Sequence, residues 1–175
     1  MAPIAIGIHG GCGTLSPDLM GEAEWAQSRA HLGEALRAGW SILAEGGSSV
    51  AAVEAAIVRL EDSAHFNAGY GAALTEAGDH ELDASIMDGS TLAAGAVCAV
   101  RRIRNPIRAA RAVMEKSSCV LLAAGAADAF AERAGLAMVD NGYFTTQRRI
   151  DTLAALKKRA ATGDRKSTRL NSSHG

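Results

Sequence analysis

Apolar residues in the first third of the chain follow an extended spacing and then a helical one. Residues 4–8 form a short apolar run that ends in the glycine-rich stretch 9–13, which is typical of a buried strand entering a loop. Two helices are expected next, separated by Gly46-Gly47, and Ser48 or Ser49 can cap the second. Their apolar faces are Leu32, Leu36, Trp40 and Leu43 in the first helix and Val50, Val53, Ile57 and Leu60 in the second.

The middle of the chain carries the pattern of a β-hairpin. After an irregular stretch at residues 61–71, apolar and polar side chains alternate from Leu82 to Met87, and Asp88-Gly89 marks a turn. Residues 92–100 resume the extended pattern, so the two stretches are predicted to pair as antiparallel strands. Asp83 is expected to be a hydrogen-bonded polar residue of this hairpin.

A helix, a strand and a second helix are expected after the hairpin. Asn105 as N-cap and Pro106 at the first helical position predict a helix start. Residues 120–123 are a short apolar run, predicted to be a buried strand, and residues 126–133 a short helix. The buried stripe of the helix that starts at Pro106 is predicted to be Ile107, Ala110, Val113 and Met114.

A last helix, opened by Thr145 or Thr146, completes the order strand, helix, helix, strand, strand, helix, strand, helix, helix. Its apolar positions are Ile150, Leu153 and Leu156. The antiparallel hairpin argues against a doubly wound parallel sheet, so we predict an α/β (α+β) domain over residues 1–164, with helices layered on a mixed or antiparallel sheet. Residues 165–175 are polar and without periodicity, and are predicted to be a disordered tail.

Composition excludes several classes of protein. At 175 residues, 48% hydrophobic and 21% charged, the chain is long and apolar enough for one globular domain. A net charge of -1 offers no electrostatic footprint for nucleic acid or an anionic membrane. No apolar run could cross a bilayer, and the N-terminus shows no secretory signal. The three cysteines fit free thiols in a reducing compartment, which favours a cytoplasmic location.

The glycine-rich stretch 9–13 lacks the marks of a nucleotide-binding loop. A Walker loop needs a lysine after its last glycine, where this chain has Thr14, and the three-glycine dinucleotide fingerprint is not completed. We therefore interpret the stretch as a tight turn, with His9 as a structural residue and Cys12 as a small apolar filler.

Residues 60–71 are the most informative stretch of the sequence. They leave a helix, turn on two glycines, and contain many backbone carbonyls that no sheet satisfies. Carbonyl-rich turns suit hard cations, which prefer oxygen ligands, whereas a solvated loop is the plainer alternative.

Four segments, taken together and in this order, resemble a known family. HGGCG at residues 9–13 resembles the HGGxG loop of the plant-type asparaginases, also called isoaspartyl peptidases, and FNAGYG at residues 66–71 resembles their FNAGxG segment. ELDASIMDG at residues 81–89 resembles their ELDAxxMDG hairpin, and GAV at 95–97 with RNP at 104–106 continues it. The likeness extends over about residues 4–162.

The resemblance implies an N-terminal nucleophile hydrolase with a four-layer αββα sandwich, of which this chain would form the N-terminal half. In that family a precursor cleaves itself before a threonine. The freed threonine, with its own α-amine as general base, attacks the side-chain amide of asparagine or a β-aspartyl peptide bond. The threonine, the substrate-binding residues and the oxyanion donors all belong to the following subunit. No catalytic residue is therefore expected in this chain, which is predicted to be inactive alone.

The family residues that match this chain support the active site. Asn67 matches an asparagine that helps to order the site and self-cleavage, and Gly10 and Gly11 match the glycine loop that influences processing. No cofactor for catalysis is implied, but a structural sodium ion bound by backbone carbonyls is. Those carbonyls belong to Leu60, Glu61, Ser63, Phe66, Ala68 and Tyr70.

The expected partner is the missing β-subunit half, in an (αβ)2 heterotetramer that acts on a small-molecule or dipeptide substrate. His174-Gly175 resembles a processing junction, but residues 165–175 fit better as a foreign tail, and both interpretations leave the nucleophile out. Two alternatives stay open. One is the α-subunit of a glycosylasparaginase, which shares the fold and the processing, and the other is a non-catalytic interaction domain.

Overall fold

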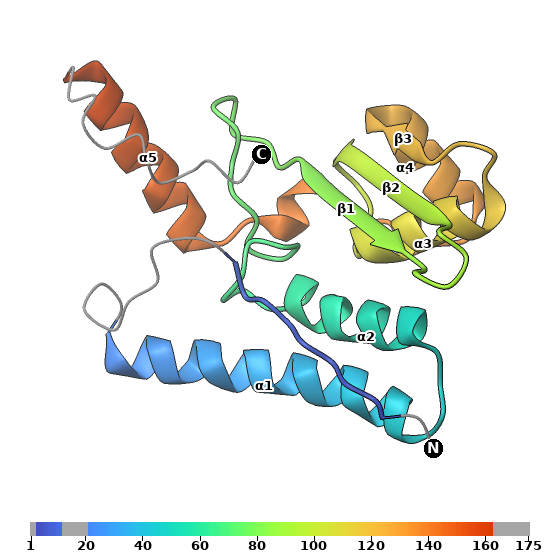
Figure 1. Ribbon diagram of the computed structural model, residues 1–175. Coiled ribbons are helices and arrows are strands. Elements are labelled where there is room, and N and C mark those ends of the chain that lie inside the picture. The colour runs from blue at the N-terminus through green and yellow to red at the C-terminus, as the bar shows by residue number, and fades with distance from the viewer. Residues whose placement is uncertain (1–2, 12–20, 163–175) are drawn as a thin grey trace.

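The computed structural model describes residues 3–11 and 21–162 and contains helices around a small sheet (Figure 1). The predicted tail, residues 165–175, and Cys12 lie outside the described residues. In chain order the elements are α1 (Glu22–Ala44), α2 (Ser49–Glu61), β1 (Leu82–Met87), β2 (Ala94–Val100), α3 (Pro106–Lys116), β3 (Leu121–Ala123), α4 (Ala124–Arg133), the 3-10 helix η1 (Asn141–Phe144) and α5 (Gln147–Ala161).

Helices α1 and α2 form a hairpin around Gly46-Gly47, as predicted, and the Oγ of Ser48 caps α2 by accepting a hydrogen bond from Ala51 N at 3.1 Å. The face that α1 buries differs from the predicted one. Its buried residues are Ser28, Ala35 and Gly39, whereas Leu36 and Trp40 are exposed. The contact between α1 and α2 buries small residues because the two backbones approach closely. A Cβ on Gly39 would lie 2.8 Å from the carbonyl oxygen of Ala52.

The predicted strand at residues 4–8 is wrong. These residues run along α1 and α2 without strand pairing, and Ile4 is 47% exposed (Figure 1). A strand exists only when a neighbour completes its hydrogen bonds, and no described strand lies beside this segment. Ile6 anchors it to α1, because its Cδ1 occupies the space where Gly39 lacks a side chain.

The predicted hairpin is confirmed. Strands β1 and β2 pair antiparallel, with Ser85 opposite Ala96, and Asp83 Oδ1 accepts a hydrogen bond from Ala99 N at 2.8 Å. The second strand starts at Ala94 because Leu92 adopts a φ of 61° in the turn. Strand β3 then joins β2 in parallel, so the sheet is mixed, as expected.

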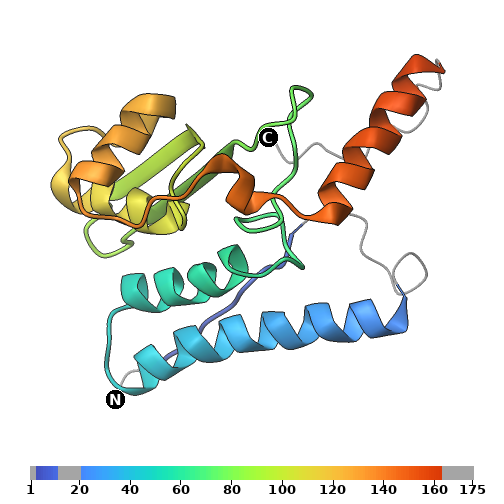
Figure 2. The same cartoon turned by 180° about the vertical axis from the view of Figure 1, so that it is seen from behind.

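Helices α3 and α4 cover one face of the sheet (Figure 2). The main core lies between these helices and the sheet and includes Val97, Val100, Ile103, Val113 and Phe144. A second cluster packs Ile86, Ile107 and Ala110 against residues of α2.

The opposite sheet face is open. Met87 and Leu121 are both more than half exposed there, and strand β3 is therefore not the buried strand that its apolar sequence predicted. This open face is the side of the sheet that no described helix covers.

Helix α5 projects from the rest of the molecule and buries none of its residues (Figures 1 and 2). The apolar spacing predicted the helix correctly, and Thr146 occupies its N-cap position without a side-chain cap hydrogen bond. Ile150 and Leu156 are each close to half exposed.

Candidate functional site

The loop between α2 and β1 closes on itself. We call residues 61–71 the site loop. Tyr70 N donates a hydrogen bond to the carbonyl of Glu61 at 2.7 Å, which brings the two ends of the loop together. Within it, Ser63 N donates to Leu60 O and Phe66 N donates to Ser63 O, each at 3.2 Å. The stretch is therefore an ordered set of turns and not an extended connection.

Two glycines make this closure possible. A Cβ on Gly69 would lie 2.5 Å from the carbonyl oxygen of Glu61, a distance that real side chains do not reach. Gly71 has a φ of +90°, and a Cβ there would lie 3.1 Å from the carbonyl oxygens of both Ala64 and Phe66. Both glycines of the sequence motif are thus required by backbone packing inside the loop.

The structure brings the glycine-rich stretch onto the site loop. A Cβ on Gly10 would lie 3.2 Å from Cε1 of Phe66, so a larger residue would press on the phenyl ring. Gly11 has a φ of +118°, and its N–H donates to Nδ1 of the exposed His9 at 3.2 Å. Gly10 and the segment around Asn67, remote in sequence, therefore meet in space.

Asn67 itself is exposed at the surface of the site loop. No described residue forms a hydrogen bond with its side chain, although its neighbours Phe66 and Gly69 are buried. The loop thus holds an amide group outward with its hydrogen-bonding capacity unused by the described residues.

Glu61 ties the loop to α3. Its side chain is 2% exposed, and Oε1 accepts a hydrogen bond from Ile107 N, in the first turn of α3, at 2.8 Å. Burial away from water raises the pKa of this carboxyl to about 8 against an ordinary 4.5, and hydrogen bonds from Ile107 and Asn105 oppose the rise. Oε2 is buried without a described hydrogen-bond partner. At neutral pH the group is largely a neutral acid, which costs less to bury than an anion.

The predicted cap of α3 is corrected by this arrangement. Asn105 occupies the N-cap position, but its side chain makes no cap hydrogen bond and donates instead to Asp62 Oδ1 at 3.2 Å. The carboxyl of Glu61 satisfies the helix N–H in its place, so a residue remote in sequence performs the capping.

The other end of the site loop is held by the segment around η1. Gly71 N donates to the carbonyl of Phe144 at 2.9 Å, and the Nε of Arg149 donates to the carbonyl of Gly71. Sequence reasoning missed both residues. Phe144 is an aromatic in a short 3-10 helix, and Arg149 is one of two adjacent arginines, so neither carries a local signal.

A buried histidine supports the same region. His80 is 1% exposed, its Nε2 lies 2.9 Å from Thr145 Oγ1, and its Nδ1 lies 3.2 Å from the carbonyl of Ala73. Burial lowers the pKa of this imidazole below its ordinary 6.5. Asn141 accepts a hydrogen bond from His80 N and donates to the carbonyls of His80 and Arg101, each at 2.9 Å. These groups satisfy one another and fix η1 to the residues just before β1 and just after β2, which indicates a structural role.

Three of the six predicted sodium ligands have unused oxygens. The carbonyls of Leu60, Glu61 and Ser63 each accept a backbone hydrogen bond, whereas those of Phe66, Ala68 and Tyr70 accept none from the described residues. Among described side chains, no cluster of three or more His, Cys, Asp or Glu residues is arranged to hold a metal. A cation at this loop would therefore depend on backbone oxygens, as hard cations permit.

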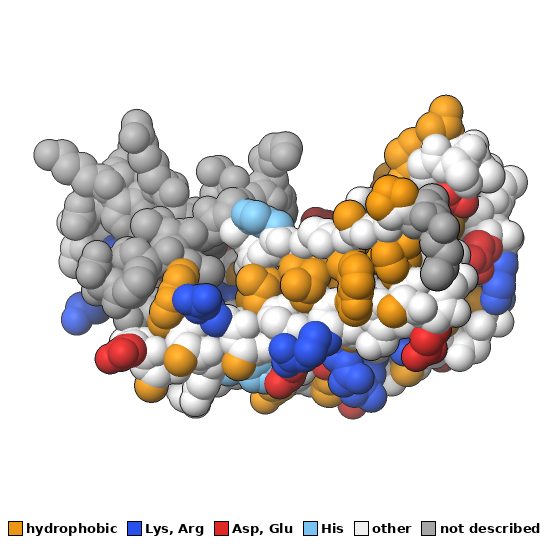
Figure 3. Space-filling model, turned by 60° about the horizontal axis from the view of Figure 1, so that its bottom comes forward, with side chains coloured by type: hydrophobic (Ala, Val, Ile, Leu, Met, Phe, Trp, Pro, Cys, Tyr) orange, Lys and Arg blue, Asp and Glu red, His pale blue; other side chains and the backbone are white. Residues whose placement is uncertain are grey.

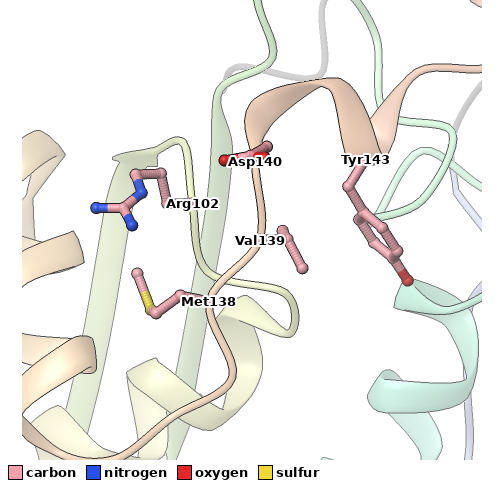
Figure 4. A pocket seen from close by; sticks show the side chains of 5 residues that line it. All are labelled: Arg102, Met138, Val139, Asp140 and Tyr143. Atoms are coloured by element: carbon pink, nitrogen blue, oxygen red, sulfur yellow. The ribbon is translucent and has the colours of Figure 1, made fainter.

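An open hollow of about 500 Å³ lies at the far side of η1, lined by Arg102, Met138, Val139, Asp140 and Tyr143 (Figure 4). The Tyr143 ring is 5.7 Å from that of Tyr70, and the guanidinium of Arg104 lies 5.8 Å from its centre. No serine, threonine or cysteine lines the hollow, and its polar side chains are those of Arg102, Asp140 and Tyr143.

The chain is similar in sequence to known proteins. The chain is 44% identical over 148 residues to the isoaspartyl peptidase/L-asparaginase of Xenopus laevis, and the match covers 85% of this chain and 46% of that protein. It is 46% identical over 151 residues to the isoaspartyl peptidase/L-asparaginase of Homo sapiens, covering 85% of this chain and 46% of that protein.

A bacterial relative gives the same result. The isoaspartyl peptidase of Escherichia coli is 40% identical over 162 residues, which cover 93% of this chain and 50% of the relative. The chain thus spans about half the length of these relatives. The model of the asparaginase family matches residues 1–174. This chain belongs to the asparaginase family.

Proposed function

We propose that this chain is the α-subunit half of a threonine-nucleophile amidohydrolase that converts L-asparagine to L-aspartate and ammonia and removes β-aspartyl residues from peptides. The observation that carries the proposal is the meeting of Gly10 with Phe66, which joins two motifs that are far apart in sequence into one surface beside Asn67. The names of the relatives supply the reaction class.

The chemistry would come from the second half. A threonine freed by cleavage would attack the amide carbon, with its α-amine taking the hydroxyl proton, and the amide nitrogen would leave as ammonia or as the peptide amine. Water would then hydrolyse the acyl-enzyme ester and release aspartate. The role of this chain is to shape and order the wall of the site against which the threonine sits.

Asn67 fits such a wall. Its amide offers two N–H donors and one acceptor, and the described residues use none of them. The neighbouring backbone is held by Gly69, Gly71 and Phe144, so the amide is presented from a fixed loop. Gly10 would support it through its close approach to the Phe66 ring, and Gly11 would supply the left-handed turn, with a φ of +118°, that follows.

Two exposed apolar surfaces support the proposal that a second half completes an αββα sandwich. The first is the open sheet face with Met87 and Leu121. The second runs along residues 4–8 and α1, where Ile4, Leu36 and Trp40 are exposed and hydrophobic side chains form a row (Figure 3). Neighbouring exposed apolar side chains are typical of protein–protein interfaces. The second half would cover both, and two such pairs would form an (αβ)2 heterotetramer.

The loop carbonyls that accept no described hydrogen bond support the proposal of a structural sodium ion. Gly71 lies against the carbonyl oxygens of Ala64 and Phe66, so the loop backbone turns its oxygens inward there, and the carbonyls of Phe66, Ala68 and Tyr70 remain available. Bound sodium would stiffen the turns that present Asn67. It would take no part in the reaction, for which we propose no cofactor.

We propose a cytoplasmic location on the basis of the free thiols. Cys98 and Cys119 are free within the described residues, which suits a reducing cytoplasm. None of the described helices is long and apolar enough to span a membrane.

The test is to express the chain alone and together with the second half of a family member, and to measure ammonia release from asparagine and aspartate release from a β-aspartyl dipeptide. We expect no activity from the chain alone and activity from the pair. Asn67→Ala should lower the activity of the pair at least ~10-fold without lowering the yield of soluble complex. A pair that assembles but acts on neither substrate would refute the proposal.

A further inference from the structure

Both backbone groups of Gly71 are held by one segment of the chain. Its N–H donates to the carbonyl of Phe144, the last residue of η1, and its carbonyl accepts from Arg149 in the first turn of α5. Residues 144 and 149 thus each form a hydrogen bond with the backbone of a single glycine at the end of the site loop. Phe144 is fully buried in the main core, so the first connection is anchored.

Arg149 differs from the arginine beside it. Its guanidinium is partly buried, and this burial, together with the nearby charge of Arg148, lowers its pKa. Arg148 is half exposed and instead pairs with Glu24 on α1 at 2.7 Å. Burial of a cation is costly unless it is paired or hydrogen-bonded. The carbonyl of Gly71 provides that partner, so the contact is specific to Arg149.

The contact reaches Asn67 through the backbone. Gly71 lies against the carbonyl oxygens of Ala64 and Phe66, with too little space for a Cβ, so a shift of Gly71 must shift the turn that contains Asn67. On its other side, Arg149 belongs to α5, a helix with no buried residue of its own. The base of a helix that packs no buried residue against the rest of the chain is therefore connected to the site loop.

We propose that Arg149 is a positioning residue that couples α5 to the site loop and so sets the orientation of Asn67. For the part that concerns catalysis this rests on the proposed function, whereas the coupling itself does not. Phe144 fixes Gly71 to the core, and Arg149 fixes the direction of its carbonyl, so that movement of α5 moves the loop.

The coupling is tested by amide hydrogen exchange on the chain as it stands, comparing Arg149→Ala, Arg149→Lys and the control Arg148→Ala. Loss of a hydrogen bond from a charged donor should speed exchange in residues 66–72 by ~10-fold or more in Arg149→Ala. Arg149→Lys keeps one charged donor and should restore part of the protection. Arg148→Ala should change exchange in these residues far less, because its ion pair with Glu24 is solvent-exposed and contributes little.

A merely stabilising role would speed exchange throughout the chain and lower the melting temperature in proportion. Unchanged exchange in residues 66–72 in Arg149→Ala, or an equal effect of Arg148→Ala, would overturn the coupling.

The functional part uses the chain paired with the second half. Arg149→Ala should lower kcat at least ~10-fold with a smaller change in KM, and Arg149→Lys should recover part of it. If the unsubstituted pair is inactive while residues 66–72 still respond to Arg149→Ala, the proposed function fails and the coupling stands. If kcat is unchanged although exchange responds, the positioning role is overturned.

Discussion

The layer formed by the sheet, α3 and α4 and the projecting helix α5 both carry apolar residues, but they use them differently. In the first region Val100, Ile103 and Val113 are fully buried, whereas Ile150 in α5 is 45% exposed. Helical spacing alone does not separate the two cases, since α3 and α5 are both amphipathic. The difference shows that one region has its packing partner within this chain and the other lacks it among the described residues.

The site loop lies where these two regions meet. Glu61 attaches it to α3 in the well-packed layer, and Arg149 attaches it to α5. The loop thus takes its order from both sides, and Asn67 is presented between a rigid support and one whose packing is incomplete.

One large expected effect distinguishes the substitution of two isoleucines, one in each region. Ile103→Ala removes a fully buried side chain from the main core and should cost about 2–5 kcal/mol of unfolding free energy, because it leaves a cavity. Ile150→Ala should change it by less than about 0.5 kcal/mol, since the side chain is half exposed on α5. Urea denaturation of the two variants, followed by circular dichroism, measures both values.

A second half bound to the chain sharpens the contrast. If α5 packs against that half, Ile150→Ala should become destabilising only in the complex. Equal costs for the two isoleucines in the chain alone would mean that α5 is packed after all, and the distinction between the regions would be lost.

The next expected effect is a pH dependence of stability, and it concerns Glu61, which joins the site loop to α3. The pKa of Glu61 is about 8 in the folded protein against an ordinary 4.5, so the folded state holds this proton more tightly than the unfolded chain. Its contribution to stability is complete below about pH 4.5 and is lost progressively as the pH rises towards about 8. A shift of this size corresponds to a loss of roughly 3–5 kcal/mol.

Glu61→Gln isolates that contribution, because glutamine keeps an acceptor for Ile107 N and cannot ionise. We expect the unfolding free energy of the parent chain to fall relative to that of Glu61→Gln between pH 5 and pH 8, measured by urea denaturation at each pH. Parallel pH profiles for the two proteins would show that Glu61 is already ionised at neutral pH.

The sequence predicted elements whose partners are near in the chain. The hairpin from Leu82 to Val100 has its turn, its alternation and its pairing strand within one stretch, so local patterns suffice. Residues 4–8 have the same apolar character but no described neighbouring strand, and a strand cannot be assigned from one segment's own residues. The exposed side of β3 was likewise hidden from sequence, because apolar spacing does not say whether a covering layer is present.

The sequence predicted the site loop itself but not the contacts that hold it to the rest of the molecule. FNAGYG marks a loop whose glycines are required by contacts inside the loop itself, and those contacts are local. The capping of α3 by Glu61 and the hold of Arg149 on Gly71 join residues 46 and 78 positions apart. Nothing in the spacing around either residue signals such a contact, because each depends on how separate elements pack.

A smaller effect is expected for the loop's own glycines. Gly69→Ala places a Cβ 2.5 Å from the carbonyl oxygen of Glu61, so the backbone must shift, at a cost of about 1–3 kcal/mol. Gly89→Ala is the matched control in the hairpin turn, where a Cβ would meet no atom within 4 Å. Thermal unfolding of the two variants should show a clear loss for the first and little change for the second, and similar melting temperatures would mean that the loop has room to relax.

The smallest expected effect on the chain's own stability concerns the open sheet face. Leu121 is 52% exposed there, so Leu121→Ser should change the unfolding free energy by no more than about 0.5 kcal/mol. Leu92→Ser is the control, because Leu92 is 71% exposed but lies in the hairpin turn and not on that face. If the second half covers the open face, titration of the chain with that half should show several-fold weaker binding for Leu121→Ser and unchanged binding for Leu92→Ser. Equal affinities for both variants would place the second half elsewhere, and the exposed leucine of β3 would then have no part in completing the sandwich.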